Sequence, residues 1–140
     1  MLKGTEQKKV LRVIDANFNR TKEGLRVCED LCRFIWGNKK PTEQYKRIRH
    51  QLTRTIEDLM SVKSLVAARD ILRDVGKKSI NVEMRREDVA GVFYANSQRT
   101  KESIRVLEEF SKLFNPELAQ RLKRLRYQVY ALEKEIISRL

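Results

Sequence analysis

The stretch that decides the fold is ANFNRTKEGLRVCEDLCR (residues 16–33), because it occurs a second time as ANSQRTKESIRVLEEFSK (residues 95–112). Nine of the eighteen positions are identical when Ala16 is aligned with Ala95 and no gap is opened. A second segment, KRIRHQ (residues 46–51), matches KRLRYQ (residues 123–128) at almost the same separation. Two matching segments at nearly the same separation indicate that the chain is a duplicated unit.

Apolar spacings of three and four residues predict that each copy is a pair of helices. The first helix is expected to begin at Thr5, as its N-cap, and to end near Gly37, and the second to restart near Pro41. Their apolar faces would carry Leu11, Ile14, Phe18, Leu25, Cys28, Cys32 and Ile35 on the first helix and Tyr45, Ile48, Leu52, Ile56 and Leu59 on the second. The other faces of the second helix would be basic, with Lys46, Arg47, Arg49 and Arg54.

A shorter helix over residues 61–72 and an irregular segment are expected to join the two copies. The third long helix would begin around residues 86–88 and run to Phe114, where Asn115 and Pro116 stop it. The last helix carries a heptad series of Leu118, Leu122, Leu125, Val129, Leu132 and Ile136. Long loops in small helical domains are often functional, so the charged residues of the irregular segment are candidates for a site.

These elements predict an all-α fold: an antiparallel helical bundle with an internal pseudo-twofold repeat and an inserted short helix and loop. Residues 1–140 would form a single domain, with repeat 1 at about 5–60, a linker helix and loop at 61–86, and repeat 2 at about 87–140. Because each helix pair has one apolar seam, the two halves must pack against each other and bring the repeated stretches to the pseudo-axis. Apolar surface left over could serve a homodimer contact.

Composition narrows the classes of partner. The formal net charge of +12 favours an anionic partner, which could be a phosphorylated metabolite, nucleic acid or an acidic protein surface. Basic residues alternate with acids along the helices and only 7% of residues are aromatic, which argues against nucleic acid. No GxxxxGKS or GxGxxG motif occurs, which excludes the ordinary nucleotide-binding folds.

The sequence also predicts the compartment. No apolar run approaches the ~20 residues that cross a bilayer, and the first residues lack the apolar core of a signal peptide. We therefore expect a cytoplasmic protein with no membrane partner. Cys28 and Cys32 lie four apart on one helix face with poor geometry for a disulfide, so we expect reduced core residues. With His50 the only histidine, no zinc pattern is present.

Both copies carry the motif Asn-x-x-Arg-x-x-Glu-x-x-Arg-x-x-Glu. Its members are Asn17, Arg20, Glu23, Arg26 and Glu29 in the first copy and Asn96, Arg99, Glu102, Arg105 and Glu108 in the second. A step of three residues drifts around a helix, so the series cannot stay on one solvent face and its first members should approach the core or a cleft. Two interpretations remain, an i, i+3 ion-pair ladder and a polar site at the pseudo-axis.

RDILRDVG (residues 69–76) places two carboxylates, Asp70 and Asp74, beside a glycine at which the backbone can turn. Hard oxygen ligands of this kind suit Mg²⁺, which takes one or two carboxylates together with phosphate oxygens. The alternative is that one aspartate caps a turn and the other forms a surface pair.

DANFNRTKEGLRVCEDLCRF, RDILRDVG and ANSQRTKESIRVLEEF together resemble an all-helical hydroxymethylpyrimidine-phosphate kinase domain that is often fused in front of thiamine-phosphate synthase. The resemblance covers about residues 12–133. It implies ATP-dependent phosphorylation of hydroxymethylpyrimidine phosphate to its diphosphate, with ATP and Mg²⁺ as cofactors. The synthase barrel that is usually attached is missing from this sequence. A free-standing domain could supply the diphosphate to a separate thiamine-phosphate synthase, or it could have kept the fold and lost the reaction. The matching positions are Asp15, Asn17, Arg20, Glu23, Arg26, Asp30, Arg69, Asp70, Asp74, Gly76, Asn96, Arg99, Glu102, Arg105 and Glu108.

Side-chain chemistry assigns roles within this set. The catalytic candidates are Arg20 and Arg99, whose planar forks match phosphate oxygens, together with Arg26 and Arg105. The substrate-binding candidates are Asn17, Asn96, Asp15 and Arg69, and the Mg²⁺ candidates are Glu23, Glu102, Asp70 and Asp74. The rival hypothesis is a non-catalytic helical module that dimerises or docks on an acidic or phosphorylated partner, with the Asn and Arg positions as buried structural links.

Overall fold

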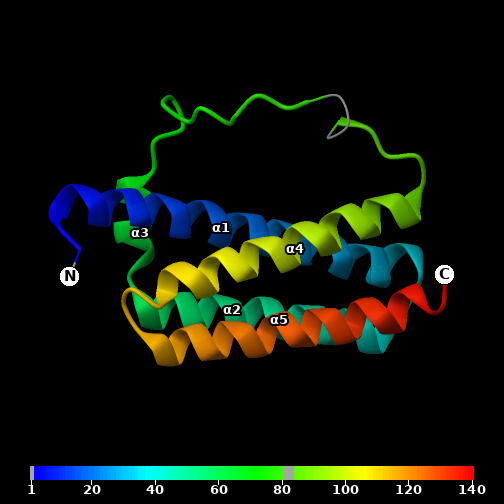
Figure 1. The fold of residues 1–140 in the computed structure, drawn as a ribbon. Helices are drawn as coiled ribbons and strands as arrows, with labels where there is room; N and C mark the ends of the chain where they lie inside the picture. Colours follow the sequence, from blue (N-terminus) through cyan, green and yellow to red (C-terminus); the bar gives the residue numbers. More distant parts are fainter. Residues whose placement is uncertain (1, 81–83) are drawn as a thin grey trace.

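The computed structural model describes residues 2–80 and 84–140, and within them it shows a bundle of four long helices without strands (Figure 1). The elements are α1 (Gly4–Asp30), the π-helical turn η1 (Leu31–Ile35) that continues it, α2 (Lys39–Leu59), the short α3 (Val62–Ala68), α4 (Val89–Ser111) and α5 (Pro116–Ile137). Residues 81–83 of the expected irregular segment lie outside the described residues. The predicted all-α antiparallel bundle is confirmed.

The four long helices form a ring in which each runs antiparallel to its neighbours (Figure 1). α1 packs most extensively against α4, and the ring closes through α1 with α2, α4 with α5 and α2 with α5. The described parts of the connection, residues 69–80 and 84–88, together called the 69–88 segment, return along the outer side of α1 and α4 to the start of α4 (Figure 1). The two repeated stretches therefore face each other at the centre of the bundle, as predicted.

α1 and α4 cross at small residues of the repeated stretches. The Thr21 hydroxyl donates a hydrogen bond of 2.6 Å to the Ser103 hydroxyl across the interface. A Cβ atom added to Gly24 would lie 2.4 Å from the Thr100 Oγ1 atom. In the alignment of the two copies Thr21 corresponds to Thr100 and Gly24 to Ser103, so the two contacts are the same contact seen from each half. The pseudo-twofold axis passes between these contacts, which we call the crossing.

A buried ion pair ties the two helices of each copy together. Glu29 on α1 accepts from Arg49 on α2 at 3.1 Å, and Glu108 on α4 accepts from Arg126 on α5. Both carboxylates are buried, and the bond to Glu108 raises the pKa of the Arg126 guanidinium. Arg49 lies off the apolar face of α2, as predicted, but it is half-buried there, because the buried carboxylate of Glu29 needs a neighbouring positive charge.

The ends of the first helix differ in part from the prediction. α1 begins at Gly4, with Lys3 before it, so Thr5 is not its N-cap. At the other end, the five-residue π turn rotates the chain out of the α-helical phase, and Ile35 is 57% exposed instead of lying on the apolar face. Gly37, with φ of 62°, ends the helix as predicted. This turn begins inside the first matching segment (residues 16–33), just before the point where the separation from the second copy changes.

The boundaries of α3 and α4 are also corrected. α3 ends at Ala68 rather than Leu72, because Arg69 takes an extended ψ of 137° that carries its side chain to α1. α4 begins after Asp88, whose side chain caps its first turn, and ends at Ser111 rather than Phe114. In α5 the expected heptad residues Leu118, Leu122, Leu125, Val129, Leu132 and Ile136 are all buried, as predicted.

Cys28 and Cys32 are free, buried core residues, as expected. Burial raises the pKa of both thiols, that of Cys32 to about 11. Among the described residues, no helix is both long enough and apolar enough to span a membrane.

Candidate functional site

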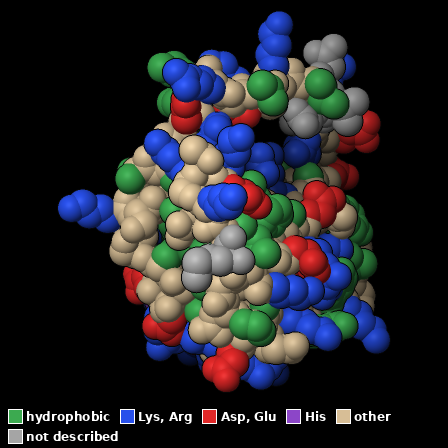
Figure 2. Space-filling model, turned by 60° about the vertical axis from the view of Figure 1, so that its left-hand side comes forward, with side chains coloured by type: hydrophobic (Ala, Val, Ile, Leu, Met, Phe, Trp, Pro, Cys, Tyr) green, Lys and Arg blue, Asp and Glu red, His purple; other side chains and the backbone are tan. Residues whose placement is uncertain are grey.

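A groove of about 440 Å³ lies between α1 and the first residues of the 69–88 segment. It is lined by Lys9, Arg12, Val13, Asp15, Ala16, Asn17, Asn19, Arg20, Arg69, Asp70, Ile71 and Asp74. Six of these were predicted as site residues from the sequence: Asp15, Asn17, Arg20, Arg69, Asp70 and Asp74. Figure 2 shows the segment standing above the bundle, with Lys and Arg side chains on the surface beneath it. The groove therefore joins the first motif copy to the RDILRDVG segment, which lies beyond α2 and α3 in the chain.

Asp15 and Arg69, both predicted to bind substrate, form the wall of the groove by binding each other. The Arg69 Nε and Nη2 atoms donate to the two Asp15 carboxylate oxygens at 2.7 and 2.8 Å. Asp15 is only 4% exposed, and the hydrogen bond to it raises the pKa of Arg69. Asn19 adds a bond of 3.2 Å to the same carboxylate, and Arg12 donates to the Asp70 carbonyl at 3.1 Å. These bonds fasten the start of the 69–88 segment to α1.

The last two members of each motif copy belong to the ion-pair ladder. Arg26 lies 3.5 Å from Glu29, and Arg105 lies 3.8 Å from Glu108. Both glutamates are buried and already paired with an arginine of the neighbouring helix. Arg26 and Arg105 therefore each add a second, more exposed positive charge beside a structural ion pair. The sequence prediction placed Arg26 and Arg105 among the catalytic candidates, and the geometry shows both of them in contact with a structural carboxylate.

Arg20 and Arg99 differ from the other motif arginines. Within residues 2–80 and 84–140, neither is paired with a carboxylate. The hydrogen bond of Arg20 runs to the Asn17 Oδ1 atom at 3.5 Å, a long and weak contact. Both side chains are exposed. They are guanidinium forks whose donors remain available to an anion.

Asn17 and Asn96 are held alike. The side-chain amide of each donates to the carbonyl four residues earlier, Asn17 to Val13 at 2.8 Å and Asn96 to Val92 at 2.9 Å. Asn17 is buried and Asn96 is half-buried, so the first member of the motif does approach the core, as its helical drift predicts. The amide oxygen is left to face the arginine or a ligand.

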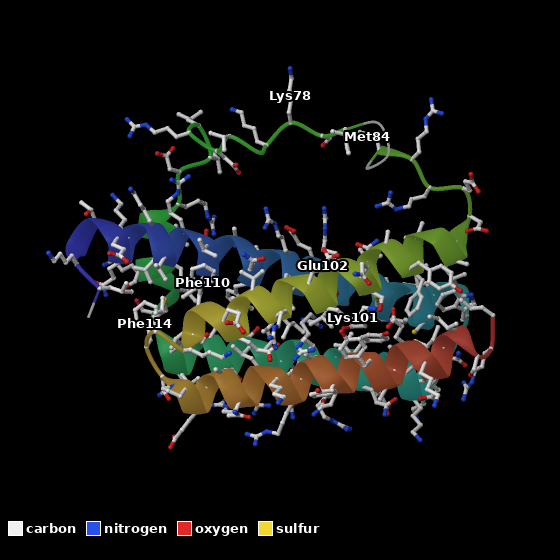
Figure 3. All side chains as sticks on the ribbon, in the orientation of Figure 1. Lys78, Met84, Lys101, Glu102, Phe110 and Phe114 are labelled. Atoms are coloured by element: carbon white, nitrogen blue, oxygen red, sulfur yellow. The ribbon has the colours of Figure 1, made fainter. Side chains whose placement is uncertain are left out.

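Arg20, Glu23, Arg99 and Glu102 are all exposed, and each immediately precedes a residue of the crossing. Because α2 and α5 cover the opposite side of the α1–α4 pair, these four residues, the pseudo-axis quartet, lie on its outer face. Figure 3 places Glu102 on the side of α4 that faces the 69–88 segment, whereas Lys101 turns toward α5 and pairs with Glu133 at 2.9 Å. The quartet therefore adjoins the groove at Arg20.

The carboxylates predicted to bind Mg²⁺ lie in two places, Glu23 and Glu102 in the quartet and Asp70 and Asp74 in the groove. One oxygen of each aspartate accepts a backbone N–H of its own turn, at 3.2 Å for Asp70 and 2.9 Å for Asp74. No group of three or more potential ligands converges among the residues that the structure describes. One or two carboxylates completed by phosphate oxygens is the arrangement that Mg²⁺ commonly adopts, and this donor set fits it.

The family model named the ThiD2 family matches residues 12–135, a span that contains the whole groove except Lys9 and the whole quartet. The chain belongs to the ThiD2 family. No solved structure gives a significant match to it.

Curated relatives of this ThiD2 chain are named thiamine-phosphate synthase. That of Synechocystis sp. is 41% identical over 130 residues, which cover 92% of this chain and 36% of the relative. That of Nostoc punctiforme is 39% identical over 133 residues, covering 94% and 36%, and that of Rhodopirellula baltica is 37% identical over 132 residues, covering 94% and 35%. The ThiD2 chain thus spans about a third of the length of the relatives it matches.

Lys9, Arg12 and Asn19 line the groove but were missed in the sequence. Their signal is helical spacing, because Arg12 and Asn19 lie three and four residues from Asp15 along α1, and Lys9 lies three residues before Arg12. These three residues could have been predicted from their charged or amide side chains and from this spacing along the helix.

Proposed function

We propose that this ThiD2 domain transfers a phosphoryl group from ATP to hydroxymethylpyrimidine phosphate and so forms its diphosphate. Membership of the family and similarity to thiamine-phosphate synthases support a role in thiamine biosynthesis. The observation that carries the kinase proposal is that Arg20 and Arg99 pair with no carboxylate among the described residues, whereas the motif arginines Arg26 and Arg105 are paired. The adjoining groove of about 440 Å³ has the volume of a small-molecule site.

The rate of this reaction depends on positioning of the phosphates and neutralisation of their charge more than on removal of a proton. An oxygen of the acceptor's phosphate attacks the γ-phosphorus of ATP, the bond from that phosphorus to the β–γ bridging oxygen breaks, and ADP leaves with the bonding electrons. Arg20 and Arg99 would hold the phosphates in line, while Asn17 and Asn96 would contact pyrimidine or adenine edges. Mg²⁺ held by carboxylates among Glu23, Glu102, Asp70 and Asp74 would neutralise phosphate oxygens when bound.

A second candidate is a non-catalytic module that binds the phosphorylated pyrimidine or docks on a partner, including a separate synthase or a second copy. It is favoured by exposed apolar side chains in the 69–88 segment, namely Ile71, Leu72, Val75, Ile80 and Met84. Such a module would bind the pyrimidine phosphate without consuming ATP. A measurement of ATP consumption therefore distinguishes the kinase from the binding module.

The test is formation of the pyrimidine diphosphate, measured by mass spectrometry with ATP and Mg²⁺, for the parent and for Arg20→Lys. Lysine keeps the charge but replaces a fork by a point charge, so one charged contact in the transition state is lost. We expect a roughly thirty- to thousand-fold loss of turnover, corresponding to about 2–4 kcal/mol. Lys22→Arg, which keeps its charge over the Phe18 ring, is the matched control and should keep parental turnover.

Absence of the diphosphate with the parent protein would reject the kinase proposal in favour of the binding module. Full activity in Arg20→Lys would move the proposed phosphate contact to the 70–76 part of the groove. Unfolding of that variant would make Arg20 a structural link.

A further inference from the structure

A second, smaller pocket of about 280 Å³ lies between the first turns of α1 and the residues that follow α3. It is lined by Thr5, Lys8, Lys9, Arg12, Ala68, Arg69, Asp70 and Arg73. Four of these residues, Lys9, Arg12, Arg69 and Asp70, also line the groove of the candidate site, so the pocket and the groove share a wall. We call it the cationic pocket, because five of its eight lining residues are Lys or Arg and one is acidic.

Hydrogen bonds between α1 and the 69–88 segment fix the shared wall of the pocket. The Arg12 Nη2 atom donates to the Asp70 carbonyl at 3.1 Å, and the Arg69 guanidinium is held by the buried Asp15 carboxylate at 2.7 and 2.8 Å. Beside the pocket, α1 also packs directly against α3 (Figure 1). Both arginines of the shared wall are therefore held in place by the fold itself.

The charges in the pocket do not balance. The two arginines that the 69–88 segment contributes are paired with the carboxylates of Asp15 and Asp70. The three cations that α1 contributes, Lys8, Lys9 and Arg12, form no ion pair among the residues that the structure describes. They lie three and four residues apart on one face of the helix, where like charges repel. An anion with several negative charges would neutralise all three.

The distribution of charge indicates which phosphorylated ligand suits the pocket. The proposed reaction has two such ligands, ATP with three linked phosphate groups and the pyrimidine with one. Outside the shared wall, Arg20 is the one described cation that lines the groove, so more of the positive charge lies in the pocket. Lysine and arginine donate charge-assisted hydrogen bonds to phosphate oxygens. The pocket therefore fits the longer phosphate chain and the groove fits the single phosphate.

The spacing along α1 joins the two sites. Arg20 lies eight residues beyond Arg12, which is about 12 Å along the helix. Long side chains at the two positions can reach toward each other over that distance. A phosphate chain that contacts Arg12 can therefore extend along α1 toward Arg20.

We propose that the cationic pocket binds the phosphate chain of ATP, with Lys8, Lys9 and Arg12 as its contacts. The terminal phosphate then points along α1 toward Arg20, and the pyrimidine phosphate lies in the groove. This inference rests on the proposed function and gives the phosphoryl donor a site outside the repeated motif.

The test replaces Lys8 and Lys9 together, as Lys8→Gln with Lys9→Gln, which removes two charges from exposed residues and leaves the hydrogen bond of Arg12 in place. The matched control is Lys39→Gln with Lys40→Gln, which removes two exposed lysines at the start of α2, outside the pocket. Calorimetric titration at one fixed ionic strength measures the binding of inorganic pyrophosphate, ADP and hydroxymethylpyrimidine phosphate.

We expect the α1 double variant to bind pyrophosphate and ADP roughly tenfold more weakly and to raise KM for ATP by a similar factor. Its affinity for the pyrimidine phosphate and its Tm should equal those of the parent. The α2 double variant should match the parent in every measurement.

The other outcomes separate this inference from the proposed function. Turnover by the parent with an unchanged KM for ATP in the α1 double variant would overturn the inference and leave the kinase proposal standing. Equal losses in both double variants, or a parent that binds neither pyrophosphate nor ADP, would also overturn the inference. Weaker binding of the pyrimidine phosphate alone would place the acceptor in the pocket and overturn the assignment to ATP. Binding of pyrophosphate and ADP that depends on Lys8 and Lys9, in a protein that forms no pyrimidine diphosphate, would support the pocket as a phosphate-chain site and reject the kinase.

Discussion

Gly24→Ala tests the crossing of α1 and α4, on which the pseudo-axis quartet stands. The added Cβ would lie 2.4 Å from the Thr100 hydroxyl oxygen and 3.0 Å from the Asn96 carbonyl oxygen. Both distances are shorter than ordinary van der Waals contact, so the two helices must separate locally. Overpacking of this kind costs about 1–3 kcal/mol, offset by the gain of about 1 kcal/mol when alanine replaces glycine inside a helix.

The expected net loss is therefore up to about 2 kcal/mol of unfolding free energy, or a Tm lower by up to about 8 °C. Thermal unfolding followed by circular dichroism measures it. Gly4→Ala is the matched control, because nothing lies within 4 Å of its added Cβ, and its Tm should not fall.

A double-mutant cycle identifies the cause of the loss. Thr100→Ala removes the hydroxyl that the new methyl group meets, so Gly24→Ala with Thr100→Ala should be at least about 1 kcal/mol more stable than the two single changes predict. The Asn96 carbonyl remains, so the relief is partial. A Tm for Gly24→Ala above that of the parent, or strict additivity in the cycle, would refute the close crossing.

Two further predictions concern buried groups. Glu108→Gln leaves the buried side of the Arg126 pair without its charge and should lower the unfolding free energy in urea by about 2–3 kcal/mol. Glu109→Gln, at an exposed position, should leave the unfolding free energy nearly unchanged, and equal effects of the two changes would contradict the buried pair. Because burial raises the pKa of Cys32 from 9.0 to about 11, its unfolded thiol ionises first, so its contribution to stability is complete below about pH 9 and falls as the pH rises toward 11. Between about pH 8 and about pH 10.5, the urea midpoint of the parent should therefore fall more than the urea midpoint of Cys32→Ala. In a separate measurement, iodoacetamide should alkylate Cys28 and Cys32 rapidly only after unfolding.

Features of short range were predictable from the sequence. The stop at Gly37, the start of α5 after Asn115 and the apolar face of α5 all follow from residues within one or two helical turns of one another. The packing of the two halves against each other was also predictable, because a single helix pair cannot bury its own apolar seam.

Features set by contacts distant in sequence were not predictable. α3 stops at Ala68 because Arg69 reaches Asp15, 54 residues earlier in the chain. Likewise the pairing of Glu29 with Arg49 turned one basic residue inward, although both residues recur in the second copy as Glu108 and Arg126. The repeated spacing carried that signal, but only the geometry of the helix pair shows that the side chains meet.

The same limit applied to the site. Composition and motif marked the right face of α1 but could not separate free arginines from paired ones. That separation depends on which carboxylates the fold brings within reach: Arg26 meets Glu29, and Arg20 meets none among the described residues.

The measurement that tests the central claim most directly is a crystal structure of the domain with ADP, Mg²⁺ and hydroxymethylpyrimidine phosphate. The account predicts phosphate groups on the outer face of the α1–α4 pair, within hydrogen-bond distance of Arg20 or Arg99 and beneath the 69–88 segment. The opposite face of the bundle offers a groove of about 410 Å³ between α2 and α5, lined in part by Arg54 and Arg124. Ligand phosphates found only there, around Arg124 or near Arg47, with none at Arg20 or Arg99, would contradict it.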